Sequence, residues 1–460
     1  MPIRFPGMSP STLHQWCNRL RWLLCAVLLG TTSVAFAWSD HTLGTWQALA
    51  VMPAIVQAPP VAVESLDAFL AAEESGVATL LAQEEAWDRR NVPAYPPRPD
   101  ALQFRPGGPP ATRRQRFMAA LRINPNCQLA LFLQMRPGTL PPPGSELPWT
   151  EVTTLKHDNT VRHNRFEHLH AGEHVAVLEV IGSASGEPDD GLDIGLWEDN
   201  GTSYGRVYGF GKQPFGDPAL EFSSQAPFHM GFYHESPIIY KAASFLRRTF
   251  PEYRIHLYES LAKFALQTGH PYWGWRFAGW ALHYVQDLTQ PYHATVLPGV
   301  STARMLWINA LDIAGWHGPK DRAIRLVSNR HLALENYQYN RMRAAYLHDN
   351  PDDALLRALR NTLPDAAQAP WADAAPRQVV SRQAHDWADR TDHMLEQAVP
   401  AKYISDPAYV FEHTEPDIDL FTVLKSAPQN MQDEMTQLVA TLMQHFGTQS
   451  RVFIASLARP

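Results

Sequence analysis

Cysteine is scarce in this sequence, and the few residues present exclude a disulfide-stapled fold. There are three cysteines in 460 residues. Cys17 and Cys25 lie within the first 37 residues, so Cys127 would stand alone in a chain that lost this segment. No intrachain disulfide could then form. Core packing and metal ligation are the remaining means of stabilising such a chain.

Basic charge is also sparse, which argues against a general binder of polyanions. The formal net charge is −7. Residues 1–37 contain three arginines and no acid, so their removal would take the net charge from −7 to −10. Nonspecific affinity for nucleic acid requires dense Lys and Arg. We therefore expect no stable nucleic-acid binding, and no protein partner is predicted.

Two common catalytic motifs are missing as well. Residues 182–186 have the glycines of a G-x-S-x-G elbow but carry Ala184 where the nucleophilic serine is needed. Residues 209–212, GFGK, lack the spacing and the Ser/Thr of a phosphate-binding loop. The sequence thus offers no support for a serine hydrolase or an NTPase.

After residue 37 no apolar run is long enough to cross a bilayer, whereas residues 1–37 have the pattern of a secretory signal peptide. The segment begins with a basic region free of acids, continues in the short apolar run Trp22–Phe36, and ends in the cleavage triplet Ala-Phe-Ala at 35–37. Cleavage there would make Trp38 the mature N-terminus. We expect export to the periplasm or the extracellular space.

The sequence does contain a dense group of metal-ligand side chains, centred on Trp273–Ala294. His283 and Asp287 are four residues apart, so they share one face of a helix. Pro291 is expected to end this helix and to let the chain turn, which would bring His293 back to the same point. Two imidazoles and a carboxylate converging at a helix end form a site that zinc commonly occupies.

A second pair repeats the same spacing farther along the chain. His331 and Glu335 are again four residues apart. Taken alone, a pair of this kind is usually a solvated surface pair of little energetic value. Two such pairs, together with His293 and candidate ligands in upstream loops, indicate a metal cluster instead.

At the central motif, ALHYVQDLTQPYHA, the chain resembles the zinc-dependent phospholipases C and the related single-strand nucleases. Both groups bind three clustered zinc ions in an all-helical fold. The resemblance covers the mature N-terminus and, in patches, residues 189–336. It implies a mainly α, multi-helix bundle of phospholipase C/nuclease type, with Pro/Gly-rich inserted loops and at most a short β-hairpin.

The resemblance also implies a set of ligands. A mature N-terminal tryptophan would chelate zinc through its α-amino nitrogen and its carbonyl oxygen, an arrangement that the low pKa of an α-amino group allows. A loop aspartate would bind zinc and orient the attacking water; Asp189 is preferred here over Asp199. The Ala-Pro-Phe-His run favours His229 over His234. The expected ligands are Trp38, His41, Asp189, His229, His283, Asp287, His293, His331 and Glu335.

The expected organisation is a catalytic domain at 38–340, with an insertion at about 95–190, followed by a C-terminal helical extension at 341–460 that packs on this domain. Val152–Ile181 is the best strand candidate. Helices are predicted at Asp352–Leu359, Arg377–Ala398 and Met431–Leu457, where apolar residues recur at helical spacing.

Nine ligating groups exceed the four or so that one zinc ion takes, so they suit a cluster. Zinc would activate water for phosphodiester hydrolysis, with Asp189 as the catalytic residue. Glu335, in place of an aspartate, favours the phospholipase C branch, which cleaves the glycerol side of the phosphate in phospholipids such as phosphatidylcholine at membrane or micelle surfaces. A single-strand zinc nuclease is the alternative, and a non-enzymatic secreted metal-binding protein is less favoured. The aromatic residues near the motif could contact a headgroup, although core packing is preferred for them; they are Tyr272, Trp273, Trp275 and Tyr292.

Overall fold

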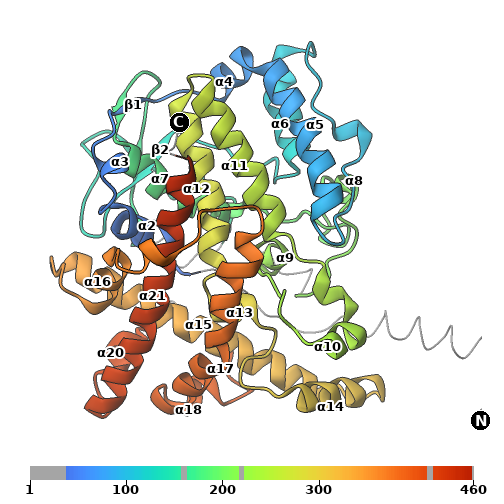
Figure 1. Ribbon diagram of the computed structural model, residues 1–460, viewed down its shortest axis with the longest axis vertical. Helices are drawn as coiled ribbons and strands as arrows, with labels where there is room; N and C mark the ends of the chain where they lie inside the picture. Colours follow the sequence, from blue (N-terminus) through green and yellow to red (C-terminus); the bar gives the residue numbers. More distant parts are fainter. Residues whose placement is uncertain (1–37, 157–162, 217–221, 412–417, 458–460) are drawn as a thin grey trace, which may run out of the picture.

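The computed structural model describes residues 38–156, 163–216, 222–411 and 418–457, and these residues are mainly helical (Figure 1). The mainly α class predicted from the sequence is confirmed. The predicted signal peptide, residues 1–37, lies outside the described residues. In the described part of the chain, no helix has the length and the apolar character needed to cross a membrane.

Two long helices, α11 (Pro251–Gln267) and α12 (Pro271–Asp287), form the centre of the fold and run side by side. Each begins with proline, which suits the first turn because its missing N–H would have no helical partner there. Every residue of α12 after Pro271 is buried. Its aromatic-rich sequence is apolar on most sides, as expected for a helix enclosed by others.

Helix α7 (Val177–Gly186) packs closely along α12. A Cβ atom placed on Gly279 would lie 2.5 Å from the Cβ of Ala184, so only glycine permits this approach. The strand prediction for Val152–Ile181 is therefore wrong at its C-terminal end. Despite the weak alternation of apolar and polar residues, this end of the segment forms helix α7, because its small and apolar residues fill the groove beside α12.

The strands are short and belong to two small sheets. In the first, β4 (Phe166–His168) pairs antiparallel with both β2 (Phe132–Gln134) and β3 (Glu146–Leu147). In the second, β1 (Val61–Ala62) pairs antiparallel with β5 (His174–Val175), with Val61 opposite Val175. The strand structure thus exceeds the single hairpin expected. Through β5 and α7 the region at 95–190 contacts β1 and α12, which lie outside it in the sequence.

The C-terminal helices share a core with the N-terminal helix α2 (His41–Leu49). Helix α21 (Gln429–Leu457) packs on both α2 and α12, and α17 (Ser381–Ala398) packs on α21. The phenyl ring of Phe446 would lie 2.6 Å from a Cβ on Gly44, so α2 and α21 are in close contact. The extension predicted at 341–460 thus packs on the rest of the chain.

The predicted C-terminal helices are present with shifted ends. Helix α17 starts later than predicted because η9 (Pro376–Val380), a wide π-helical turn, precedes it. The longest helix, α15 (Gly318–Leu347), lies across the opposite end of α12 from α4 (Figure 1). The other α-helices are α3 (Pro53–Val56), α4 (Leu66–Ala72), α5 (Glu74–Asn91), α6 (Arg113–Leu121), α8 (Gly205–Tyr208), α9 (Ala226–His229), α10 (Pro237–Ala242), α13 (Pro291–Ala294), α14 (Thr302–Ile313), α16 (Ala354–Arg360), α18 (Ala401–Ile404) and α20 (Leu420–Leu424).

Candidate metal centre

Side chains from six elements converge at the C-terminal end of α12. They form three groups, two of which share His283, and within each group one nitrogen or oxygen from each residue lies within 4.8 Å of the others. These groups contain eight of the nine ligands predicted from the sequence. They are His41, Asp189 and His283; His229, His283 and Asp287; and His293, His331 and Glu335.

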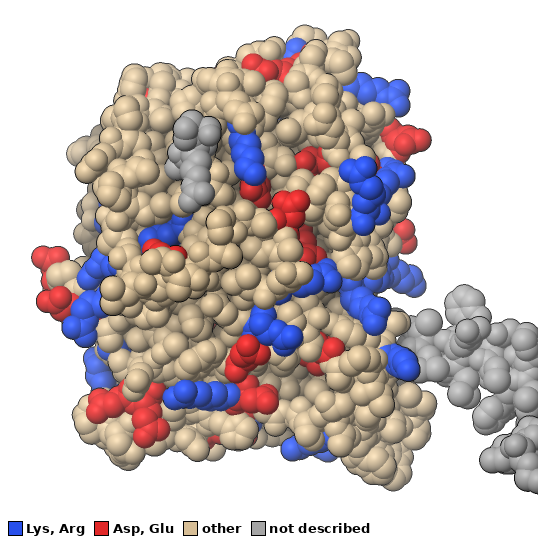
Figure 2. Space-filling model, viewed as in Figure 1, with Lys and Arg blue, Asp and Glu red and all other residues tan. Residues whose placement is uncertain are grey.

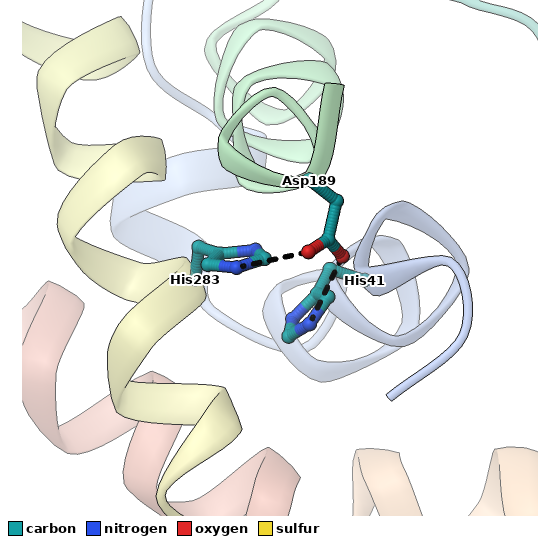
Figure 3. Close-up of side chains that lie close together, drawn as sticks. All are labelled: His41, Asp189 and His283. Atoms are coloured by element: carbon teal, nitrogen blue, oxygen red, sulfur yellow. Dashed lines mark ion pairs between the residues drawn. The ribbon is translucent and has the colours of Figure 1, made fainter. Parts of the chain in front are cut away.

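The first group joins three elements that lie far apart in the sequence (Figure 3). His283 projects from α12, His41 from the start of α2, and Asp189 from η5 (Pro188–Leu192), the turn that follows α7. Oδ1 of Asp189 lies 3.6 Å from Nε2 of His283, and Oδ2 lies 3.9 Å from Nε2 of His41. These separations leave room for an ion between the side chains.

Asp287 connects the groups. Its Oδ2 lies 2.9 Å from Nδ1 of His229 and 3.3 Å from Nε2 of His283. Its Oδ1 faces the other way, 3.3 Å from Nε2 of His41 and 3.6 Å from Nδ1 of His293. Helix α12 ends at Asp287, and α13 returns His293 to this point, as the position of Pro291 predicted.

The third group lies on α13 and α15. Nε2 of His331 is 2.6 Å from Oε1 of Glu335, one turn farther along α15. The rings of His293 and His331 meet edge to face, with their centroids 5.0 Å apart. Gln290 donates a 2.9 Å hydrogen bond to Oε1 of Glu335, and this fixes the orientation of the carboxylate.

Hydrogen bonds outside the cluster set which ring nitrogen of each histidine faces inward. Nδ1 of His283 lies 2.8 Å from the carbonyl oxygen of Ser185, which can only accept, so this nitrogen carries the proton. Nδ1 of His41 lies 2.8 Å from Oε1 of Gln286, whose amide nitrogen donates to Thr45. In both rings Nε2 is left for an ion, the arrangement found around metal-bound histidine.

Asp193 is the residue of the site that the sequence did not reveal. Its Oδ2 lies 3.3 Å from Nε2 of His229, which leaves Nδ1 of that ring toward the cluster. Arg254 and the hydroxyl of Tyr284 hold the same carboxylate by hydrogen bonds of 2.9 and 2.6 Å. No local spacing links Asp193 to partners so distant in the sequence.

Charge and burial shift the pKa values within the site in opposite directions. Burial by itself raises the pKa of Asp287, but His283 and His229 beside it bring the pKa well below its usual range. Burial by itself lowers the pKa of His229, yet the carboxylates around it, first Asp287 and then Asp193, raise this pKa to about 10. In the metal-free protein His229 is therefore a cation held between acids.

The residues present fit a zinc site. Nε2 of His41 and Oδ1 of Asp287 are buried and make no hydrogen bond, although they lie only 3.3 Å apart. Buried polar atoms of this kind are normally satisfied, so their convergence indicates a missing positive partner. Imidazole nitrogens and carboxylate oxygens are ligands that zinc and related divalent metals accept, so these groups could hold metal ions.

The sequence left two choices of ligand open, Asp189 or Asp199 and His229 or His234, and the members of each pair lie in different places in the structure. Asp199 accepts a 2.9 Å hydrogen bond from the backbone N–H of Gln213 and is in none of the three groups. His234 lies 3.0 Å from the carbonyl oxygen of Arg377 and is likewise outside them. The structure thus brings Asp189 and His229 into the cluster, in agreement with the preferences drawn from the sequence.

Trp38 is close to the site, but its side chain serves packing. The indole is almost fully buried and donates a 3.0 Å hydrogen bond to Thr289, two residues after Asp287. Of the proposed headgroup aromatics, Tyr272, Trp273 and Trp275 are buried in the core around α12. Tyr292 alone reaches the centre, where its ring stacks on His331 at a centroid distance of 5.6 Å.

These contacts and the buried charges are the observations that bear on the function of the site. Comparison of the chain with models of known protein families, with curated proteins and with solved structures finds no match.

Proposed function

We propose that this protein is an exported zinc-dependent phosphodiester hydrolase of the phospholipase C type. The observation that carries the proposal is the gathering of eight of the predicted ligands into three groups, with Asp287 in contact with four of the histidines. Two helical His/acid pairs, a loop aspartate and the helix-start histidine meet although long stretches of sequence separate them. A structural zinc site would use four or so protein ligands and close around one ion. This arrangement has more groups and is suited to open coordination.

Bound zinc ions would supply Lewis-acid chemistry, neutralising charge on a phosphate group and making water nucleophilic at neutral pH. The residues of the chain have separate roles in this proposal. His41, His283 and Asp287 would hold the ions on the buried side of the site, since their side chains have no solvent exposure. Ser185 and Gln286 fix the histidine rings, so little reorganisation is needed when the substrate binds.

Asp189 would be the catalytic residue, orienting or deprotonating the attacking water. Its side chain is 24% exposed, whereas those of His283 and Asp287 are 0% exposed. It therefore lies where the cluster meets solvent. A carboxylate at this point can contact both an ion and an incoming water molecule, which a general base requires. The proposed substrate bond is the glycerol-side phosphodiester of phospholipids such as phosphatidylcholine.

The test uses the mature protein loaded with zinc. Phosphatidylcholine micelles and single-stranded nucleic acid are offered side by side, and release of phosphocholine and of nucleotides is measured. The proposal expects phosphocholine release that a chelator abolishes and added zinc restores. Asp189→Asn should lose turnover, while the matched control Asp199→Asn keeps it. Nucleotide release with intact lipid would reassign the site to a single-strand nuclease, and zinc-loaded protein inactive on both substrates would contradict enzymatic function.

A further inference from the structure

A pocket lined almost wholly by apolar side chains lies next to His331, one of the proposed zinc ligands. Its volume is about 250 Å³. Helix α14 contributes Met305, Leu306 and Ile308, and the floor includes Tyr292 and His331. The pocket therefore connects the proposed metal centre to a hydrocarbon-like space. A ligand that fills it would have one apolar portion and one portion that reaches the ions.

Few polar side chains line the pocket: besides Tyr292 and His331 they are Asn309, Ser328 and Lys320. Lys320 is the one charged residue on it apart from the histidine, and its ammonium is already 3.0 Å from Oδ2 of Asp312. A nucleoside would need hydrogen-bonding groups to satisfy its base and sugar, because burying polar atoms without partners is costly. An acyl chain needs none of these groups and gains free energy with each buried methylene.

Large apolar side chains are exposed on the elements around this pocket. Trp307 on α14 is 64% exposed, and Trp316, just after the helix, is 69% exposed. Ile313 and, on α10, Ile238 are also about half exposed. In Figure 2 the lower right part of the molecule, where Figure 1 places α14, shows mostly uncharged atoms. Tryptophan is enriched at the membrane–water interface, where its amphipathic ring suits the headgroup region.

The charge of this region is opposite to that of the whole chain. Residues 236–249 and 301–326 together carry seven Lys and Arg but two Asp, in a chain whose net charge is −7. Lys241, Arg247, Arg304 and Arg322 are exposed. Asp312 is buried between Lys320 and His317, so it adds little negative charge at the surface. A basic surface with exposed tryptophan complements a bilayer that contains anionic lipid.

From these observations we infer that α10, α14 and the turn after α14 form a docking surface for phospholipid membranes that contain anionic lipid, and that the pocket behind α14 accepts one acyl chain of the bound lipid. We call this region the α10–α14 surface. The inference rests on the proposed function where it concerns hydrolysis of the bound lipid, but docking on a membrane does not itself require catalysis. The surface would place a phosphodiester near His331 while its acyl chain stays buried.

Vesicle co-sedimentation of the zinc-loaded protein tests the docking. Vesicles of phosphatidylcholine with phosphatidylglycerol should bind the protein better than phosphatidylcholine alone, and added salt should weaken binding. The double variant Trp307→Ser, Trp316→Ser should bind roughly tenfold more weakly. Arg304→Gln should weaken binding about fivefold. The matched control is Trp149→Ser, in the short helix η3 (Trp149–Glu151), where the side chain is 38% exposed.

Hydrolysis of two lipids separates this inference from the proposed function. The tryptophan double variant should keep the wild-type rate on a short-chain phosphatidylcholine below its micelle concentration and lose rate on vesicles. Ala243→Leu, which narrows the pocket, should raise KM for long-chain lipid more than for short-chain lipid. Thermal unfolding should show that each variant is folded.

The remaining outcomes would contradict the proposed function, the docking surface or the acyl-chain pocket. Tryptophan-dependent vesicle binding without hydrolysis of either lipid would contradict the proposed function and leave the docking surface standing. Unchanged vesicle binding by the double variant, or a change in its oligomeric state instead, would overturn the docking surface. Equal effects of Ala243→Leu on both lipids would overturn the acyl-chain pocket, and tighter binding of single-stranded nucleic acid than of vesicles would assign the surface to a polyanion.

Discussion

Asp193 links His229 to Arg254: its Oδ2 lies 3.3 Å from Nε2 of the histidine, and its Oδ1 accepts a 2.9 Å hydrogen bond from Nε of the arginine. All three side chains are buried. The carboxylate thus balances a buried guanidinium and orients a proposed ligand. Burial by itself raises the pKa of Asp193, but the charge of Arg254, together with His229 and the hydrogen bond from Tyr284, brings this pKa below its usual value, so the carboxyl is ionised at neutral pH.

Replacing Asp193 by asparagine is expected to weaken both folding and metal binding. Loss of the charge leaves Arg254 uncompensated, which costs about 3–5 kcal/mol of unfolding free energy. Loss of the carboxylate that orients the His229 ring should lower zinc affinity by about 10–100-fold. Chemical unfolding and zinc titration against a competing chelator measure the two effects. Asp199→Asn is the control, since Asp199 is outside the cluster; equal effects of both changes would contradict the role given to Asp193.

The zinc content of two variants should differ because Asp287 and His331 occupy different places in the cluster. Oδ2 of Asp287 faces His229 and His283, and Oδ1 faces His41 and His293. Asp287→Asn should therefore remove at least two of about three ions. His331→Ala should remove one. Elemental analysis of folded protein provides the count, with His234→Ala as a control that retains the wild-type content. No more than one zinc ion in the wild-type protein would rule out the cluster.

Local spacing explains why much of this site was predictable from the sequence. Pairs four residues apart, His283 with Asp287 and His331 with Glu335, must share a helix face once the helix forms, whatever the rest of the fold does. Pro291 marks the end of α12 in the same local way. These features required no knowledge of distant contacts, and the structure places all of them as predicted.

Other features depend on contacts between distant segments and have no local signature. Asp193 acquires its role from Arg254, 61 residues away. The helix at Val177–Gly186 exists because α12 offers a groove at Gly279, and its weak alternation suggested a strand instead. Nothing in the local sequence separates the exposed Trp307 from the buried Trp273, since burial is decided by which helices pack around each residue.

The N-terminus should show separate effects of its amino group and its indole. One extra residue ahead of Trp38 blocks chelation by the α-amino nitrogen, so zinc content and turnover should fall while stability without metal is unchanged. Trp38→Phe keeps the amino group but loses the indole hydrogen bond to Thr289 and some packing. It should lower the unfolding free energy by about 1–3 kcal/mol and retain zinc. Unchanged zinc content and activity in the extended protein would contradict N-terminal chelation.

Zinc binding should release protons, because His229 is protonated in the metal-free protein at neutral pH. Its pKa is about 10. A histidine ligand must be neutral, so an ion displaces this proton, and apparent affinity should rise about tenfold per pH unit between pH 6.5 and 9. The stability of the metal-free protein depends on pH in the opposite direction. The raised pKa of His229 stabilises the folded state fully below about pH 6.5, and this stabilisation is lost as the pH rises toward 10.

Calorimetric titration of the chelator-treated protein in buffers of different ionisation enthalpy counts the released protons. His229→Gln should release about one proton fewer per cluster filled, whereas His234→Gln should match the wild type; a proton count that His229→Gln leaves unchanged would show that this histidine is already neutral before zinc arrives.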